Sequence, residues 1–192
     1  MGHRAPRARG DADGGGALTP PLTPSQTVGP FFHDCLLRED RCEGTAGDDG
    51  DAQIRVEGRV IDGDRAAVPD AVIEVWHAAG FARIGTDAEG RFSFSTTRPK
   101  RVEFERGTMQ APHLSIAVFA RGLMNHLLTR IYFDDDPSTE SDPILRLVPE
   151  VRRTTLIAKR DPGESLTPLY RFDIALQGVG ETVFFDFRSP AP

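Results

Sequence analysis

The sequence lacks a long hydrophobic run and any segment typical of an export signal. A membrane-spanning helix needs about 20 consecutive apolar residues, and no stretch of the 192 residues approaches that length. The first ten residues contain arginine, but no apolar segment follows them as it would in a signal peptide. We therefore expect a cytoplasmic protein with no membrane partner, and the chain is long enough to bury one core.

Cysteine is also scarce, and acidic residues outnumber basic ones. Only Cys35 and Cys42 are present, without the Cys-x-x-Cys spacing of zinc or redox sites, so we expect reduced thiols with no metal role. Nucleic-acid binding requires a concentrated basic surface, whereas this chain has a formal net charge of -6 and a pI near 5.4. We therefore expect no nucleic-acid partner.

No long segment has the 3.6-residue periodicity of a helix, and short strands are predicted instead. Residues 54–61 alternate between apolar and polar side chains, and residues 71–76 follow after the turn at 62–64, which suggests a hairpin. About eight short strands separated by loops are typical of an all-β protein, and we expect a β-sandwich. The other predicted strands are 91–96, 114–120, 129–133, 154–158, 170–176 and 182–187.

Composition divides the chain into three parts. Residues 1–17 are rich in Gly, Arg, Ala and Asp without an apolar pattern, and we expect a disordered tail. Residues 18–53 begin with a proline-rich stretch, which favours an extended N-terminal arm, and end in a loop rich in Gly and Asp. Residues 54–188 contain the predicted strands and are expected to form the β-sandwich domain.

The segment Ala111-Pro112-His113-Leu114-Ser115 places one histidine at the start of a predicted strand. Alternate side chains of a strand share a face, so His113 and Ser115 present one imidazole and one hydroxyl to the same side. A His-x-His pair would aim two imidazoles at a metal, but here we expect His113 to be a hydrogen-bonded structural residue. The other histidines lack ligand spacing, so we predict no metal site in this chain.

Several short motifs, in order along the chain, carry a resemblance to a known family. They are Thr23–Phe31, Ile73–Trp76, Ala111–His113, Phe119–Gly122, Thr129–Asp135, Thr155–Arg160 and Gly180–Phe187. With these motifs the sequence resembles the intradiol ring-cleavage dioxygenases, and more closely the α chains that work beside an iron-bearing β chain. The resemblance implies a β-sandwich and an active site at the junction of the two subunits.

The resemblance also implies a ligand set that this chain does not match. Catalytic members hold Fe(III) with two tyrosinates and two histidines, because anionic oxygen ligands stabilise the trivalent ion. The segments after Trp76 and before Ala111, which carry those tyrosines in catalytic members, contain none here, and Ser115 replaces the second histidine. We therefore expect no catalytic or metal-ligating residue in this chain, and Fe(III) held by the β subunit of a hetero-oligomer.

By the same resemblance, four residues line the substrate pocket of the joint site. Thr27, Gly29 and Pro30 belong to the arm, and Arg121 faces the carboxylate of 3,4-dihydroxybenzoate (protocatechuate), which O2 cleaves to 3-carboxy-cis,cis-muconate. A guanidinium is a planar fork that can hold a carboxylate in one orientation. The residues alone leave other interpretations open, namely an arm that only straps two chains together and an Arg121 that pairs with a local acid.

Two other functions fit parts of the sequence. A β-sandwich does not fix an activity, so the chain could be a non-catalytic binding or assembly module. It could also be a self-sufficient iron enzyme, against which the missing tyrosines argue. The resemblance favours the iron-free subunit of a dioxygenase.

Overall fold

The computed structural model describes residues 24, 26–29, 31–37, 52–78, 80–105, 107–163 and 166–186. The predicted tail over residues 1–17, Pro30 and Cys42 lie outside these residues, so the predicted boundaries at residues 17 and 53 stay predictions. Cys35 is described and carries an exposed, free thiol. Within the described ranges, no helix is both long enough and apolar enough to cross a membrane.

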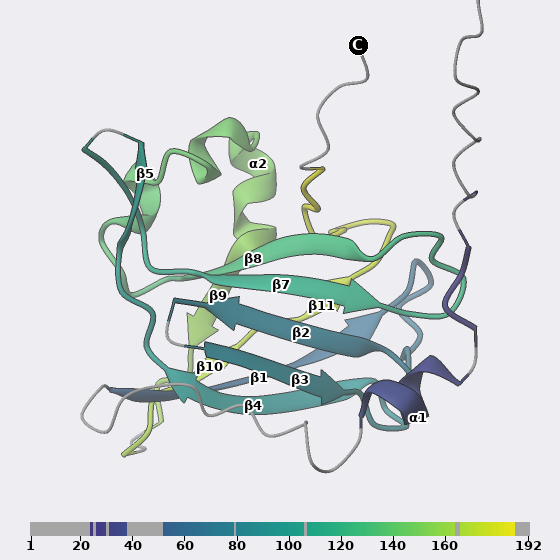
Figure 1. Ribbon diagram of the computed structural model, residues 1–192. Coiled ribbons are helices and arrows are strands. Elements are labelled where there is room, and N and C mark those ends of the chain that lie inside the picture. Colours follow the sequence, from purple (N-terminus) through teal and green to yellow (C-terminus); the bar gives the residue numbers. More distant parts are fainter. Residues whose placement is uncertain are drawn as a thin grey trace, which may run out of the picture.

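The described chain is built mainly of short strands, with two short helices and three 3-10 turns (Figure 1). The strands are β1 (Gln53–Ile61), β2 (Val72–His77), β3 (Gly80–Gly85), β4 (Arg91–Thr97), β5 (Val102–Glu105), β6 (Thr108–Gln110), β7 (Leu114–Phe119), β8 (Leu127–Phe133), β9 (Ile157–Arg160), β10 (Leu169–Arg171) and β11 (Ile174–Ala175). The helices are α1 (Phe32–Leu36) and α2 (Glu150–Arg153), and the 3-10 turns are Thr139–Ser141, Leu145–Leu147 and Thr154–Leu156.

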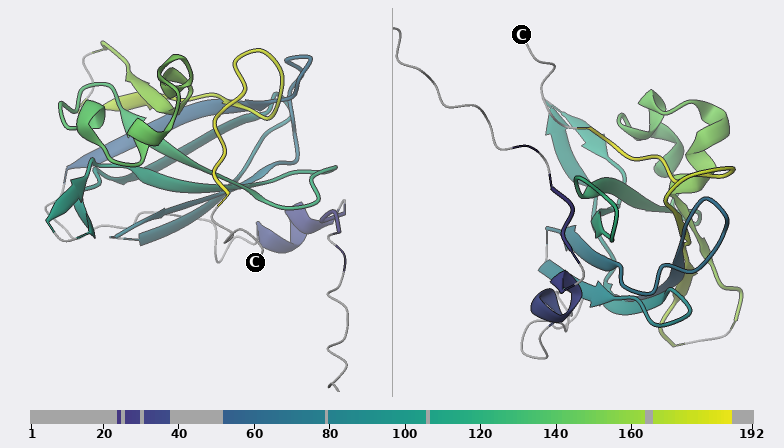
Figure 2. Two further views of the ribbon diagram at one scale, coloured as in Figure 1. Left: turned by 90° about the horizontal axis from the view of Figure 1, so that it is seen from above. Right: turned by 90° about the vertical axis from the view of Figure 1, so that its right-hand side faces the viewer.

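The main sheet has the strand order β11-β1-β10-β9-β8-β7-β2-β3, and β4 pairs with β1. The sheet curls around its core until β3 lies beside β4, which leaves it nearly closed (Figures 1 and 2). Buried side chains of β2 and β7 meet those of β1 and β10 in one apolar core. The predicted all-β fold of the β-sandwich type is confirmed by this architecture.

Alternation of side chains explains the strands that the sequence predicted best. In β4, Phe92 and Phe94 are buried and their rings stack at 6.4 Å between centroids, while the residues between them are exposed. In β1, Ile54 and Val56 are buried in the same way. Gly58 follows on β1, where a Cβ atom would lie 1.7 Å from the backbone oxygen of Phe172. Only glycine allows β1 and the chain after β10 to approach this closely.

The predicted pairing of the first two strands is wrong. Strand β1 pairs with β4, β10 and β11, whereas β2 pairs with β3 and β7. The turn at 62–64 therefore leads the chain away from β1 to the other side of the core. The partners of β1 are far from it in sequence, and local turn signals do not encode such partners.

Other differences concern short elements. The structure adds β3, β5, β6, α2 and α1, the last of which follows the proline-rich stretch of the arm. Residues 154–156 form a 3-10 turn and only residues 157–160 form a strand. The predicted strand at 182–187 is reduced, in its described part, to one bridge between Leu128 and Phe185. Each of these segments is too short for a clear period of side-chain burial.

Candidate functional site

The arm and the turn after β7 meet at one edge of the sheet. The backbone N–H of Gly122 donates to Thr27 Oγ1 at 3.2 Å. Gly29 and Gly122 both have positive φ, +72° and +84°, a conformation that glycine adopts without strain. The structure therefore brings Thr27 next to the turn that carries Arg121. Pro30, the remaining predicted pocket residue, lies outside the described residues.

A small hollow separates the arm from this turn. It has a volume of about 200 Å³ and is lined by Gln26 and Val28 from the arm and, from the end of β7 and the loop that follows it, by Phe119, Ala120 and residues 123–126. The rings of Phe119 and His126 lie 5.4 Å apart across the base of that loop. Neither Arg121 nor Thr27 lines this hollow, so both side chains lie outside it.

Arg121 itself is accessible and is paired with one acid. Its Nε contacts Asp70 Oδ2, and the side chains are 60% and 20% exposed, respectively. This is the local acid that one interpretation of the sequence anticipated. An exposed ion pair of this kind contributes little stability, so the arginine stays available to a ligand.

His113 and Ser115 line a second hollow, of about 210 Å³, at the other end of β7. Strand β7 places Ser115 opposite Trp76 of β2 and opposite Arg130 of β8. Trp76 is 49% exposed and packs on Phe81 with ring centroids 4.3 Å apart. The imidazole and the hydroxyl thus face one hollow, as alternation along the strand predicts.

The environment of His113 is that of a structural histidine. Its Nδ1 lies 2.8 Å from the backbone oxygen of Ala111, and its ring is 5.7 Å from that of Tyr132. Burial lowers the pKa of His113, and the nearby charge of Arg130 lowers it further. The hydrogen bond predicted for this residue is therefore present, and the ring is held neutral near pH 7.

Both tyrosines of the chain are engaged away from this hollow. Tyr132 is fully buried, donates its hydroxyl to Asp142 at 2.9 Å and accepts a bond from Arg130 at 3.2 Å. Tyr170 donates to Asp135 at 2.8 Å. Burial raises the pKa of each phenol, and the hydrogen bond that the phenol donates to its acid raises it too. Neither phenol is disposed to become a tyrosinate ligand.

The donor set around His113 and Ser115, as far as the structure describes it, does not fit Fe(III). Among the described residues, no group of three or more His, Cys, Asp or Glu side chains is arranged to hold a metal ion. The one histidine at the ligand position is hydrogen-bonded to backbone, and its strand neighbour is Ser115. A hard trivalent ion requires anionic oxygen donors, which the hollow does not offer.

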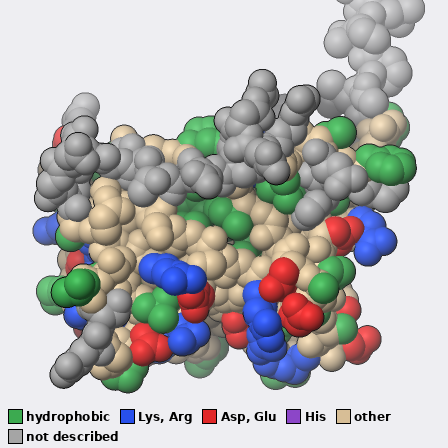
Figure 3. Space-filling model, turned by 90° about the horizontal axis from the view of Figure 1, so that it is seen from below, with side chains coloured by type: hydrophobic (Ala, Val, Ile, Leu, Met, Phe, Trp, Pro, Cys, Tyr) green, Lys and Arg blue, Asp and Glu red, His purple; other side chains and the backbone are tan. Residues whose placement is uncertain are grey.

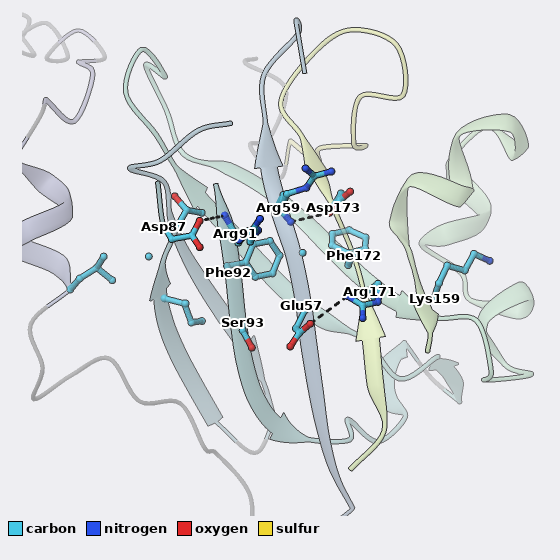
Figure 4. Close-up of a pocket in the computed structure, with 15 residues that line it drawn as sticks. Glu57, Arg59, Asp87, Arg91, Phe92, Ser93, Lys159, Arg171, Phe172 and Asp173 are labelled. Carbon is cyan, nitrogen blue, oxygen red and sulfur yellow. Dashed lines mark hydrogen bonds and ion pairs between the residues drawn. The ribbon is translucent and has the colours of Figure 1, made fainter. Parts of the chain in front are cut away.

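A further hollow, of about 920 Å³, lies over β1, β4 and β10 (Figure 4). Its charges are compensated: Glu57 pairs with Arg171 at 3.4 Å and with Arg55 at 2.8 Å. Figure 3, which views the molecule from below, also shows acidic and basic side chains intermixed. Among the described residues of the predicted site, Thr27, Gly29 and Arg121 do not line this hollow, and we assign it no ligand.

Sequence reasoning missed two acids that organise the candidate site. Asp70 pairs with Arg121, and Asp142 accepts bonds from the segment that leads to His113. Asp70 lies in the Val-Pro-Asp-Ala segment just before a predicted strand. Polar residues are common in such loops, so the sequence does not indicate a special role for this one. Asp142 is fully buried, and a single aspartate between serine and proline gives no sign of that.

Comparisons with known proteins give the family of the chain. A protocatechuate 3,4-dioxygenase α chain from Burkholderia cepacia is 38% identical over 194 residues, which cover 85% of this chain and 96% of the relative. A protocatechuate 3,4-dioxygenase β chain from Burkholderia cepacia is 28% identical over 84% of this chain and 78% of its own length. The chain matches no family model.

The fold is also similar to that of solved dioxygenase structures. The solved structure of catechol 1,2-dioxygenase from Acinetobacter sp. ADP1 superposes with a TM-score of 0.58 at 20% identity, over 78% of this chain and 60% of that one. This likeness concerns the fold alone, whereas the sequence identity to the α chain extends over nearly the whole of that relative. The chain therefore belongs to the intradiol dioxygenases, in the family of the protocatechuate 3,4-dioxygenase α chains.

Proposed function

We propose that this chain is the iron-free α subunit of an α/β dioxygenase that acts on 3,4-dihydroxybenzoate (protocatechuate), with Fe(III) held by the β subunit. The observation that carries the proposal is the pairing of both phenols with acids, Tyr132 with Asp142 and Tyr170 with Asp135, in a chain 38% identical to an α chain. A cytoplasmic location, expected from the sequence, belongs to the same proposal.

The contribution of this chain is to bind and orient the substrate. Arg121 is accessible and offers a planar guanidinium to the carboxylate of protocatechuate, which sets the direction of the ring. Thr27 and Gly29 lie on the arm beside that turn, and Pro30 is assigned to the same pocket by the proposal alone. The ring then presents its two hydroxyl-bearing carbons to the β subunit. The bond between these carbons breaks, and each takes one oxygen atom from O2 to give 3-carboxy-cis,cis-muconate.

Orientation by one cation gives the pocket its selectivity. A carboxylated catechol gains a charge-assisted hydrogen bond at Arg121, whereas catechol leaves the guanidinium without that partner. The resulting preference is expressed as a lower KM for the carboxylated substrate than for catechol, because Arg121 binds the carboxylate and lies away from the carbons that react.

The experiment is co-expression of the full chain with a β chain of the family. We expect the complex to contain iron and to consume O2 with protocatechuate, and the chain purified alone to do neither. Arg121→Gln in the complex should raise KM for protocatechuate about tenfold or more, with little change for catechol. Arg59→Gln is the matched control, because Arg59 is also an exposed arginine but lies on β1, away from Arg121.

Three outcomes would contradict the proposal. Oxygen consumption by the chain alone would mean that it holds its own iron. A complex that is active with protocatechuate but indifferent to Arg121→Gln would remove the role of that arginine. A complex whose activity equals that of the β chain alone would make this chain an assembly module.

A further inference from the structure

The turn that carries Arg121 is fixed in its backbone but not in its side chain. Leu123 N–H donates to the backbone oxygen of Ala120 at 3.3 Å, and Gly122 takes the positive φ that the third residue of such a turn requires. Arg121 therefore stands at the outer corner of a tight turn, with a side chain that is 60% exposed. A long side chain in this position needs a partner to hold one orientation.

The partner, Asp70, belongs to a well-anchored loop. The next residue, Ala71, exchanges bonds with Thr86: its N–H donates to Thr86 Oγ1 at 3.0 Å, and its oxygen accepts from Thr86 N–H at 3.0 Å. Thr86 Oγ1 also donates to the oxygen of Val68 at 2.7 Å. Because Thr86 and Ala71 are buried, Asp70 is held at a fixed point and its carboxylate is a rigid anchor.

The ion pair between the two side chains is made at the Nε edge of the guanidinium. Asp70 Oδ2 meets Arg121 at Nε, and within the described part of the chain Arg121 makes no second ion pair. The side chain of Arg121 is 60% exposed, and the two terminal nitrogens, which lie beyond Nε, have the forked geometry that a carboxylate can accept. We propose that Asp70 is a positioning residue for the substrate: it fixes Arg121 by its Nε edge so that the terminal nitrogens receive the carboxylate.

This inference rests on the proposed role of Arg121 and adds the device that gives that residue its direction. A protein carboxylate placed against the terminal nitrogens of Arg121 would compete with the substrate for those nitrogens. The Asp70 carboxylate, placed at Nε, occupies a single donor and restricts rotation of the guanidinium. The two effects of Asp70 have opposite signs. Restriction lowers the KM for a carboxylated substrate, and the negative charge of Asp70 raises it by repulsion, so the sign of the change on mutation identifies the dominant effect.

The test uses Asp70→Asn in the full chain, assembled with its β partner. We expect KM for protocatechuate to rise about three- to tenfold, which corresponds to freeing one long side chain, with kcat nearly unchanged and catechol kinetics unaffected. In an Arg121→Gln background the same substitution should have no further effect, because Asp70 acts only through that arginine.

Asp161→Asn is a closely matched control. Asp161 Oδ2 contacts Arg171 Nε at 3.0 Å, with 28% and 59% of the two side chains exposed. The pair thus also joins an acid to the Nε edge of an exposed arginine, at a site remote from Arg121, and Arg171 has Glu57 as a second partner. This variant should change neither KM nor selectivity. If Asp70→Asn does not fold, Asp70→Glu keeps the charge but displaces the carboxylate by one methylene, and it too should raise KM for protocatechuate.

Clear results would overturn the inference. A lower KM for protocatechuate in Asp70→Asn would show that repulsion dominates, and an equal loss with catechol would show a structural role. Losses that add to those of Arg121→Gln would show independent action, and an unchanged KM in Asp70→Glu would show that position is irrelevant. If Arg121→Gln alone leaves protocatechuate kinetics unchanged, the proposed role of Arg121 fails. If Arg121→Gln raises KM but Asp70→Asn does not, only the role of Asp70 fails and the proposed function stands.

Discussion

Asp142 joins three parts of the chain through one buried carboxylate. It is fully buried, and its oxygens accept bonds from the N–H of Ala111 at 2.8 Å, of Ile144 at 2.9 Å and of Leu145 at 2.8 Å. The Tyr132 hydroxyl donates to it as well, at 2.9 Å. A single side chain thus ties the start of a 3-10 turn to the segment before His113 and to strand β8. Buried carboxylates are tolerated only when paired in this manner.

We expect Asp142→Ala to lower the free energy of unfolding by about 3 kcal/mol or more, because three backbone donors and one hydroxyl lose their buried acceptor. Tyr132→Phe is the matched control, since it removes one of these bonds and keeps the ring, and it should cost about 1 kcal/mol. Urea unfolding of the full chain measures both values. A loss below 1 kcal/mol for Asp142→Ala would mean that water or a local rearrangement satisfies the donors.

His113 gives the stability of the chain a predictable dependence on pH. Its folded-state pKa lies below the ordinary value of 6.5, chiefly because of burial. Above pH 6.5 the ring is neutral in both states and contributes nothing. As the pH falls below 6.5 the unfolded state takes up a proton that the folded state refuses, so stability declines until the folded-state pKa is reached.

The measurement compares the wild-type chain with His113→Asn between pH 7.5 and 5.5. The wild-type chain should lose more stability over this interval, by at most about 1.4 kcal/mol per pH unit below 6.5, and the variant should lose less. Both proteins keep His77, whose pKa burial also lowers, so that residue contributes equally to the two curves. Parallel curves would show that His113 titrates in the folded state as it does in water.

At the scale of elements, the sequence predicts strands better than their partners. Strand β4 was predicted within one residue, because Phe92 and Phe94 alternate with polar residues and both reach the core. The partners of β1 were not predicted, because they are distant in sequence: residue 56, for example, pairs with residue 170. The pairing is made by backbone hydrogen bonds, which any sequence can form, so the side chains do not identify the partner strand. Helix α1 was missed since five residues show little more than one turn of any pattern.

Gly58 tests whether the parallel contact between β1 and the chain beyond β10 is needed. In Gly58→Ala the new methyl group would overlap the backbone oxygen of Phe172, so the strands must separate. We expect a loss of about 3 kcal/mol or more in stability, the range of a disrupted core contact. Gly107→Ala is the control: its φ is +86°, but nothing lies within 4 Å of the added Cβ, so only about 1 kcal/mol of backbone strain is expected.

Thermal unfolding of the two variants at one pH provides the comparison. A much lower Tm for Gly58→Ala than for Gly107→Ala supports a contact that only glycine permits. Similar values for the two would show that β1 can move away from Phe172 at no great cost, and that the closure of the sheet depends on other strands.

At the scale of the whole molecule, the sequence indicates what the site lacks better than how it is held together. The sequence alone shows that no tyrosine lies near Trp76 or just before Ala111. The ion pair of Arg121 with Asp70 is not, because 51 positions separate the residues and many acids could serve as partner. The structure supplies this partnership because β2 and β7 are neighbours, so the loop before β2 and the turn after β7 meet at the same edge.

The positions of the two tyrosines predict that one substitution cannot create an iron site in this chain. Ser115→His would complete a His-x-His pair facing the hollow beside Trp76. The phenolate donors would still be missing, because Tyr132 is bound to buried Asp142 and Tyr170 to Asp135 on other strands. We therefore expect the variant, loaded with Fe(III) and desalted, to show no visible absorption of ferric tyrosinate and no stoichiometric iron. The β chain treated in parallel is the positive control, and a red-brown Ser115→His chain would show that one of the two tyrosines leaves its acid to reach the metal.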